Sequence, residues 1–280
     1  MKILKTVSEL RSWSREARLR GESVGLVPTM GALHAGHASL IRAAAASCRQ
    51  VAVSIFVNPT QFGPNEDFAR YPRTFDADCA LAESAGANAV FAPSVDEIYP
   101  TAAATFVGVD GLSNRLDGLS RPGHFRGVAT VVAKLLIAAE PDRAFFGQKD
   151  AAQVAVLRRM TLDLCLASEI VVCPIVREAD GLALSSRNIY LSAVERTQAL
   201  ALSRAVREVE GLFAAGERKA AALLTAARAV MAAQPAIRID YLELVDWATL
   251  EPQPVAASGS LFAVGAWVGA TRLIDNTILP

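Results

Sequence analysis

Hydrophobic residues in the first 176 positions recur as short apolar runs, separated by longer segments that carry helical signals. Residues 51–57 (VAVSIFV) are β-branched and nearly all apolar, which is typical of a strand buried on both faces. Such strands, alternating with helices, predict a parallel sheet with helices on both of its faces. We predict strands over residues 23–27, 51–57, 88–91, 143–146 and 169–176, and helices over residues 6–21, 36–49, 74–86, 126–140 and 150–164.

The pattern changes after about residue 176. Ser192 and Glu195 have the spacing of a capping box, as Thr6 and Glu9 do near the start of the chain, and a long alanine-rich helix is predicted to follow. These signals predict a smaller α+β domain, and the one candidate boundary is READG at residues 177–181. We therefore predict two domains, residues 1–176 and 177–280. A second helix is predicted over residues 217–234, and strands over residues 237–245, 259–268 and 271–275.

Composition narrows the function classes. The chain has 280 residues, of which 52% are hydrophobic and 20% charged, so disorder is not expected. Its 28 basic and 28 acidic side chains cancel, which gives no support for nucleic acid as the main partner. The apolar stretch at residues 128–139 is interrupted by Lys134, and the N-terminus lacks a signal-peptide core, so no membrane segment is expected. The four cysteines show no CxxC spacing and are interpreted as mostly buried thiols in a reducing cytoplasm.

The segment PTMGALHAGH, residues 28–37, lies where a predicted strand meets a predicted helix. A glycine between His34 and His37 lets the backbone approach a ligand closely, and the free N–H groups of the helix N-terminus point into the same space. Two imidazoles there can donate hydrogen bonds to phosphate oxygens and stabilise charge that builds on an α-phosphate under attack. A surface histidine beside a core histidine is the plainer alternative, and a metal site is a weaker one because no third ligand is spaced nearby.

Two further segments follow predicted strands and carry polar side chains. Asn58 and Gln61 are expected at the carboxyl edge of the sheet, where amides can bind a carboxylate or hydroxyl, although an ordinary turn explains these residues equally well. Lys149, in FFGQKD, would direct an ammonium group towards a bound ligand. The alternative for Lys149 is a solvated side chain near a helix start.

Two more segments resemble anion sites. Ser185, Ser186 and Arg187 place two hydroxyls and a guanidinium in a row, which suits a triphosphate bound by a mobile loop, although polar loops are common. In RPGHFRG, Arg121 or Arg126 could neutralise an anion, while His124 is more readily interpreted as a structural turn residue.

Taken together, these motifs resemble the pantoate–β-alanine ligase family over essentially the full chain. The matching segments, in the family's order, are PTMGALHAGH, SIFVNPTQFGPNEDFARYPRT, RPGHFRGVATVVAKLL, FFGQKD, VREADGLALSSRNIYLS and IDYLELVD. The HxGH element alone is shared with many nucleotidyltransferases and class I aminoacyl-tRNA synthetases, whereas the combination is specific. The resemblance implies a Rossmann-like domain of the HxGH nucleotidyltransferase type, a smaller C-terminal lid domain and a homodimer.

The same resemblance implies the reaction. Pantoate would attack the α-phosphate of ATP, with Mg²⁺, to give pantoyl adenylate, and the amine of β-alanine would then displace AMP to form pantothenate. It implies catalytic roles for His37, His34 and Lys149, pantoate contacts from Gln61 and Gln153, and weaker candidates in Asn58 for substrate and Asp78 for the metal region. The implied ATP contacts are Met30, Gly31, Ala32, Leu33, His34, Ala35, Gly36, His37, Gly147, Gln148, Lys149, Asp150, Val176, Leu184, Ser185, Ser186 and Arg187.

Two departures from the family pattern matter. Ala152 stands where the family often has the first glutamine of a pair, so only Gln153 can be carried over. Leu184 stands where a methionine is usual, a swap that conserves volume and would leave a backbone contact intact.

Rival functions differ in the residues they need. A nucleotidylyltransferase would share the HxGH segment but would have no use for Gln61 and Gln153 as readers of a carboxylic acid. An aminoacyl-tRNA synthetase is disfavoured by a short, neutral chain without an evident anticodon domain. A catalytically silent nucleotide-binding regulator would be expected to lose Lys149 or a histidine, and this chain keeps them.

Overall fold

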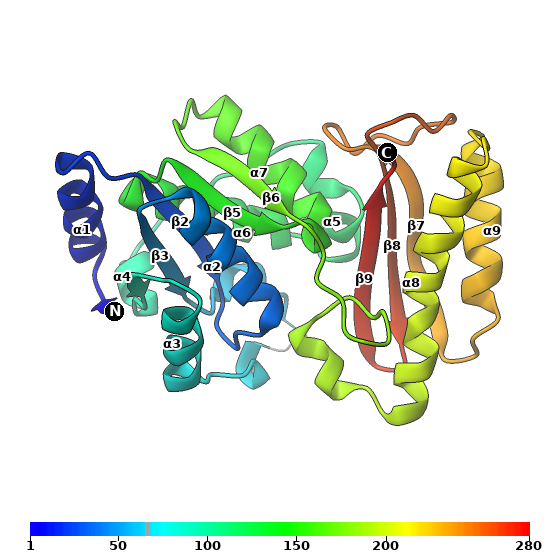
Figure 1. Ribbon diagram of the computed structural model, residues 1–280, viewed down its shortest axis with the longest axis horizontal. Coiled ribbons are helices and arrows are strands. Elements are labelled where there is room, and N and C mark those ends of the chain that lie inside the picture. Colours follow the sequence, from blue (N-terminus) through cyan, green and yellow to red (C-terminus); the bar gives the residue numbers. More distant parts are fainter. Residues whose placement is uncertain (65, 67) are drawn as a thin grey trace.

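The computed structural model describes residues 1–64, 66 and 68–280, so Asn65 and Asp67 of the second motif lie outside the described residues. Figure 1 shows a twisted parallel sheet wrapped by helices and, beside it, a smaller antiparallel sheet backed by two long helices. This architecture confirms the predicted α/β fold with a smaller α+β part. The predicted division at residues 177–181 stays a prediction, although a local bridge between Arg177 and Ala183 marks that segment.

The large sheet has six strands in the order β1-β4-β3-β2-β5-β6, all parallel. From β2 the chain adds strands first on one side and later on the other, so a topological switch point lies between β2 and β5. Ligands of such sheets bind at the carboxyl ends of the strands beside that point. The strands are β1 (Lys2–Leu4), β2 (Val24–Thr29), β3 (Gln50–Ile55), β4 (Ala89–Phe91), β5 (Arg143–Gly147) and β6 (Glu169–Cys173).

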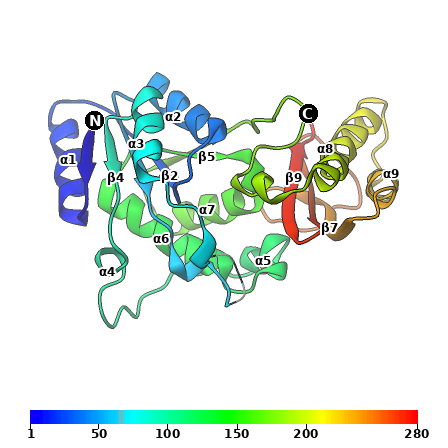
Figure 2. The same ribbon diagram turned by 90° about the horizontal axis from the view of Figure 1, so that it is seen from below.

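Helices cover both faces of this sheet, as Figure 2 shows from below. Alternate strand residues enter two different cores, because successive side chains of a strand point to opposite faces. Val27 packs with α2 and α3, whereas Leu26 packs with α1, α6 and α7. The helices are α1 (Val7–Leu19), α2 (Ala35–Ser47), α3 (Phe75–Ser84), α4 (Val95–Ile98), α5 (Asp117–Ser120), α6 (His124–Ala139) and α7 (Ala151–Asp163).

The C-terminal sheet is antiparallel, in the order β7 (Ile237–Asp246), β8 (Ser260–Val268) and β9 (Thr271–Ile278). One face packs against α8 (Ala193–Ala214) and α9 (Ala220–Ala232). Val245, Leu261 and Ala263 belong instead to the core cluster that contains α6 and α7. The small sheet is therefore packed directly into the apolar core of the large one.

Several element limits differ from the predictions. Strand β1 was not predicted, because three residues give too short a pattern to recognise. Strand β9 continues to Ile278, and β6 ends at Cys173 where Pro174 follows. Both predicted capping boxes are present, at Thr6 with Glu9 and at Ser192 with Glu195. Among the described residues, no helix combines the length and the apolar character that a membrane span requires.

A close approach between α6 and the short helix η1 (Pro59–Gln61) requires glycine at position 127. A Cβ on Gly127 would lie 2.3 Å from the carbonyl oxygen of Thr60 and 2.7 Å from the Cα of Gln61. Both neighbours are backbone, so neither can rotate away. Gly127 thus sets how closely α6 supports the loop that follows β3.

We expect Gly127→Ala to lower the free energy of unfolding by about 1–3 kcal/mol, since the added methyl group overpacks two backbone segments. Gly211→Ala is the matched control, because Gly211 lies exposed in α8 with no atom within 4 Å of a Cβ. That change should stabilise the protein by about 0.5–1 kcal/mol through helix propensity. Urea unfolding measures both, and equal effects of the two substitutions would contradict this packing argument.

Candidate active site

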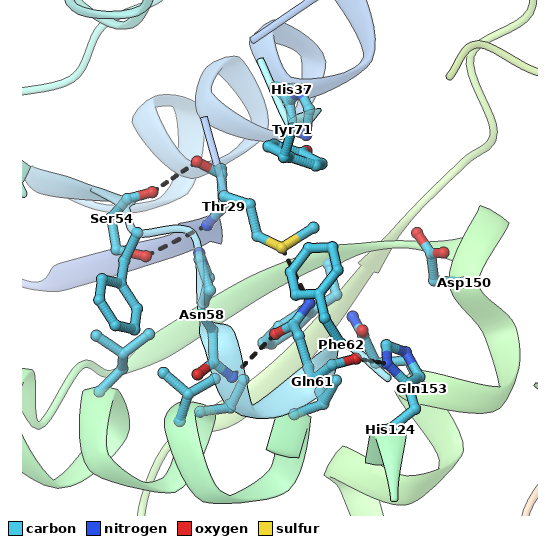
Figure 3. A pocket seen from close by; sticks show the side chains of 18 of the residues that line it. Thr29, His37, Ser54, Asn58, Gln61, Phe62, Tyr71, His124, Asp150 and Gln153 are labelled. Carbon is cyan, nitrogen blue, oxygen red and sulfur yellow. Dashed lines mark hydrogen bonds between the residues drawn. The ribbon is translucent and has the colours of Figure 1, made fainter. Parts of the chain in front are cut away.

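Two adjoining cavities, each of about 180 Å³, open at the carboxyl ends of β2, β3 and β5. The first lies between the strand ends and α6, and Figure 3 shows its polar residues. The second lies beside the start of α2 and the segment after β6. Both are at the switch point of the sheet, and they share the lining residues Met30, His37, Tyr71, Asp150 and Arg187.

A buried carboxylate stabilises the turn between β2 and α2. Asp78 of α3 is 2% exposed and accepts hydrogen bonds from the backbone N–H groups of Ala32 (3.0 Å) and Leu33 (2.7 Å). Gly31 and Ala32 have φ angles of +86° and +50°, so the chain makes a tight left-handed turn over this carboxylate. The geometry gives Asp78, the candidate for the metal region, a role in supporting the turn.

The histidine pair caps helix α2 reciprocally. His34 is the N-cap residue, and its Nδ1 accepts a hydrogen bond from the N–H of Gly36 at 3.1 Å. In return, Nδ1 of His37 accepts from the N–H of His34 at 3.3 Å. A Cβ on Gly36 would lie 2.9 Å from the ring of His34, which explains the glycine between the histidines. The His-x-Gly-His spacing is thus a capping box built from imidazoles.

This cap determines which nitrogen of each ring carries the proton. Because both Nδ1 atoms accept hydrogen bonds, a neutral ring must hold its proton on Nε2. Burial lowers the pKa of His34 to about 4, with a further contribution from Lys149, and burial lowers the pKa of His37 to about 3, assisted by His34 and Lys149. Both rings are therefore neutral at pH 7, and each has one Nε2–H group to donate. The two rings lie against each other, with centroids 4.1 Å apart.

Gln61, a predicted substrate contact, lines the first cavity and is oriented by its neighbours (Figure 3). Its Oε1 accepts from Nδ2 of Asn58 at 3.1 Å, and its Nε2 donates to the sulfur of Met30 at 3.0 Å. Asn58 is 1% exposed, and its Oδ1 accepts from Thr60 and from the hydroxyl of Tyr99. The geometry thus gives Asn58 a role in supporting Gln61. Asn58 also lines the first cavity, so its substrate contact stays a prediction.

The RPGHF segment supports the same loop from α6. Nδ1 of His124 donates to the backbone carbonyl of Gln61 at 2.8 Å, and its Nε2 accepts from Arg121 at 2.9 Å. Burial and then Arg121 lower the pKa of His124 to about 4, so this ring is neutral, with its proton on Nδ1. Arg121 also forms a bidentate pair with Glu66 at 2.6 and 2.8 Å. Arg126 stacks on Phe106 at 4.1 Å, and neither cavity is lined by it.

Most of the other predicted ATP contacts surround the second cavity, and Gln153 lines the first. Leu184 donates its N–H to the carbonyl of Val176 at 2.9 Å, which ties two of these contacts together. The remaining predicted contacts line neither of the two cavities; these are Gly31, Ala32, Leu33, Ala35 and Gln148. The second cavity is lined by Met30, His34, Gly36, His37, Gly147, Lys149, Asp150, Val176, Leu184, Ser185, Ser186 and Arg187, together with Leu40, Tyr71, Pro174 and Ile175.

The sequence did not predict the apolar wall of the first cavity. Val128, Val131, Val132 and Leu135 recur at helical spacing along α6, a pattern that also describes an ordinary core face. Thr29, Ser54, Phe62 and Tyr71 were likewise missed, because no local signal separates them from structural residues.

Comparison with known proteins gives a consistent result. The family model described as pantoate-beta-alanine ligase matches residues 2–278. Pantothenate synthetases from Acidobacterium capsulatum and Koribacter versatilis are 60% and 55% identical, covering 100% of this chain and 97% and 96% of theirs. The crystal structure of pantothenate synthetase from Thermus thermophilus is 46% identical, covers 100% of both chains and has a TM-score of 0.94. The pantoate-beta-alanine ligase of Francisella tularensis, crystallised with beta-gamma ATP and beta-alanine, is 32% identical, covers 99% of this chain and 97% of that one, and has a TM-score of 0.80.

The low pKa values of the buried histidines predict how the stability of the protein depends on pH. Unfolded histidines titrate near 6.5, whereas His37 in the fold has a pKa of about 3. The unfolded state therefore binds more protons between these values, and stability should fall as pH drops from about 6.5 towards 3. One such histidine contributes up to about 1.4 kcal/mol per pH unit to this slope.

His37→Gln tests this, because glutamine at the same helix position can keep the reciprocal cap without titrating. Urea unfolding at a series of pH values between 8 and 4 should show a shallower slope for the variant and similar stability of both proteins at pH 8. An unchanged slope would show that His37 is protonated equally in the folded and unfolded states.

Proposed function

The chain belongs to the pantoate–β-alanine ligase family, and on that premise we propose how its two cavities divide the ATP-dependent condensation of pantoate with β-alanine. The carboxylate of pantoate attacks the α-phosphorus of ATP, and pyrophosphate leaves. The amine of β-alanine then attacks the acyl carbon of pantoyl adenylate, AMP leaves, and pantothenate is formed. The observation that carries the proposal is the second cavity, which places two neutral Nε2–H donors and Lys149 around one space.

The second cavity suits the nucleotide. Lys149 and Arg187 bring positive charge to it, and Ser185 and Ser186 bring hydroxyls, which together match a triphosphate. The backbone of Val176 would face the adenine ring. Charge builds on the α-phosphate oxygens during attack, and preorganised donors of His34 and His37 would stabilise it. A carboxylate nucleophile needs no base, so we assign the histidines as hydrogen-bond donors and not as proton acceptors.

The first cavity suits pantoate, which carries a carboxylate, two hydroxyls and two methyl groups. Its apolar wall on α6 would receive the methyl groups, and the amides of Gln61 and Gln153 would bind hydroxyl and carboxylate oxygens without adding charge. Ala152 is 2% exposed and packed into the core cluster. Of the two positions where the family often has a glutamine pair, only Gln153 is therefore left to contact pantoate, beside Gln61. His37 and Asp150 line both cavities, and this shared wall is where the pantoate carboxylate would meet the α-phosphate.

Mg²⁺ is assigned to the substrate. Among the described residues, no group of three or more histidine, cysteine or acidic side chains is arranged to hold a metal ion, and the oxygens of Asp78 are occupied by backbone amides. Mg²⁺ is commonly bound through substrate phosphates with several waters retained. We therefore propose that it arrives with ATP, with Asp150 as the carboxylate that lines both cavities.

We also propose a compartment and an oligomeric state for the protein. The four cysteines are free thiols, which suits a reducing cytoplasm. The family resemblance further supports assembly as a homodimer that acts on small molecules without nucleic acid or a membrane. Sedimentation of the purified chain would test the dimer directly.

The function is tested by giving the purified protein ATP, Mg²⁺, pantoate and β-alanine, and then omitting each in turn. We expect steady AMP formation only when both acids are present, because β-alanine must release AMP from the adenylate. Steady AMP release without β-alanine would indicate hydrolysis of the adenylate or of ATP, and would contradict the ligase assignment. No AMP in the complete mixture would refute the ligase assignment.

Lys149→Ala should lower kcat by about 10²–10³-fold, the usual effect of removing one donor aimed at transition-state charge. Its melting temperature should stay close to that of the unchanged protein, because Lys149 lies at the cavity surface. Lys5→Ala, at an exposed lysine near the N-terminus, is the matched control and should leave kcat unchanged. A melting loss as large as the activity loss would instead indicate a structural role for Lys149.

A further inference from the structure

A residue of the C-terminal sheet binds the turn that carries Lys149. Asn276 of β9 is 3% exposed, and its Nδ2 donates to the carbonyl oxygens of Gln148 (3.0 Å) and Lys149 (2.9 Å). Its Oδ1 accepts in turn from the side chain of Gln148 at 3.3 Å. One buried amide thus uses both its donor and its acceptor on a single turn of the chain.

The turn has little local support of its own. Lys149 lies in η4 (Gln148–Asp150), whose N-cap residue is Gly147 and therefore offers no capping side chain. Asp150 is the N-cap residue of α7, yet its side chain makes no capping hydrogen bond. A three-residue helix without caps leaves backbone groups unsatisfied and is poorly defined by itself.

The C-terminal sheet supplies the missing support at a second point. Nε1 of Trp247, just after β7, donates to the carbonyl of Ala151 at 3.1 Å. The carbonyls of Gln148 and Lys149 are therefore bound by a side chain of β9, and that of Ala151 by a side chain that directly follows β7. Neither Asn276 nor Trp247 lines the two cavities, so both side chains can hold the turn without touching a substrate.

The neighbouring residue on β9 reaches the segment that joins the two sheets. Asp275 points to the opposite face of the strand and accepts a bidentate pair from Arg177 at 2.7 and 3.0 Å. Two consecutive residues of β9 thus hold the start of the connecting segment and the lysine turn.

We propose that Asn276 is a positioning residue for Lys149: it fixes the backbone of the lysine turn so that the ammonium group meets the phosphates in the required place. This inference rests on the proposed function of Lys149. Asn276 lines neither cavity and acts only through the turn, so its effect on the reaction is indirect. The C-terminal sheet then contributes to the active site by fixing one of its turns.

A double-mutant cycle tests this assignment. In the full chain, Asn276→Ala should lower the kcat of adenylate formation by about 10- to 100-fold, since a displacement of about 1 Å of a catalytic group has effects of this size. In a chain that already carries Lys149→Ala, the same change should lower the remaining kcat by less than about 2-fold, because the positioned group is gone. Equal losses in both backgrounds, or a normal kcat in the single variant, would overturn the proposal.

Thr277→Val is the matched control on the same strand. Thr277 is buried and its hydroxyl donates to Glu210 of α8, on the face away from the lysine turn. The control loses one buried hydrogen bond, as Asn276→Ala loses its own, but should keep the kcat of the unchanged protein. A kcat loss in the control as large as in Asn276→Ala would show that any damage to β9 suffices, and would overturn the specific role of Asn276.

Hydrogen–deuterium exchange separates this inference from the proposed function. Asn276→Ala should speed exchange of the amides of residues 148–151, whereas Thr277→Val should not. If the unchanged protein formed no AMP, the proposed function would fail, and the exchange result would still decide whether Asn276 holds the turn. Unchanged exchange in Asn276→Ala would refute the proposal that Asn276 holds the lysine turn, whatever the activity of the variant.

Discussion

The site depends on satisfying the free backbone N–H groups where β2 turns into α2. The carboxylate of Asp78 takes two of them, and the imidazoles of His34 and His37 take two more. An N–H left unpaired at a buried helix start would be costly, so these acceptors are required for the fold. Using imidazoles for this purpose commits each Nδ1 to the backbone and leaves each Nε2–H pointing elsewhere. The structural need for a cap thus creates the chemical donor.

The first cavity depends on a second close fit. Gly127 lets α6 approach the η1 loop, and Asn58 and His124 then hold Gln61 at two points, one through its side chain and one through its carbonyl. Both supports are neutral and buried, so they orient Gln61 without adding charge to the pocket. The apolar stripe of α6 forms the remaining wall. Shape and polarity of this cavity therefore come from helix packing as much as from the loop itself.

Three of the chemical segments can be located from the sequence because each follows a predicted strand, and parallel strands bring their carboxyl ends to one edge. Strand order alone therefore groups Lys149, Gln61 and the histidine pair, whereas Ser185 was singled out by the hydroxyls and the guanidinium of its own segment. The roles of Asn58 and Asp78 could not be assigned, since an amide in a turn or a carboxylate in a helix has the same local sequence whether it binds a ligand or the backbone. The α6 stripe was also missed, because core faces and cavity walls share one periodicity. Asp78 binds backbone groups 45 and 46 positions away, and the hydroxyl that Tyr99 donates to Asn58 comes from 41 positions away.

The sequence by itself determined five of the six parallel strands, the longer helices, both capping boxes and the family, because these depend on local periodicity, on caps and on motif order. Only the tertiary structure showed which polar side chains hold the backbone or another side chain in place, and which face the cavities. It showed Asn276, from the last strand, bound to the turn of Lys149, a pairing across 127 positions that no local pattern encodes. The physical reason is that a hydrogen bond needs proximity and direction, and only the packing of the two sheets brings these atoms within reach.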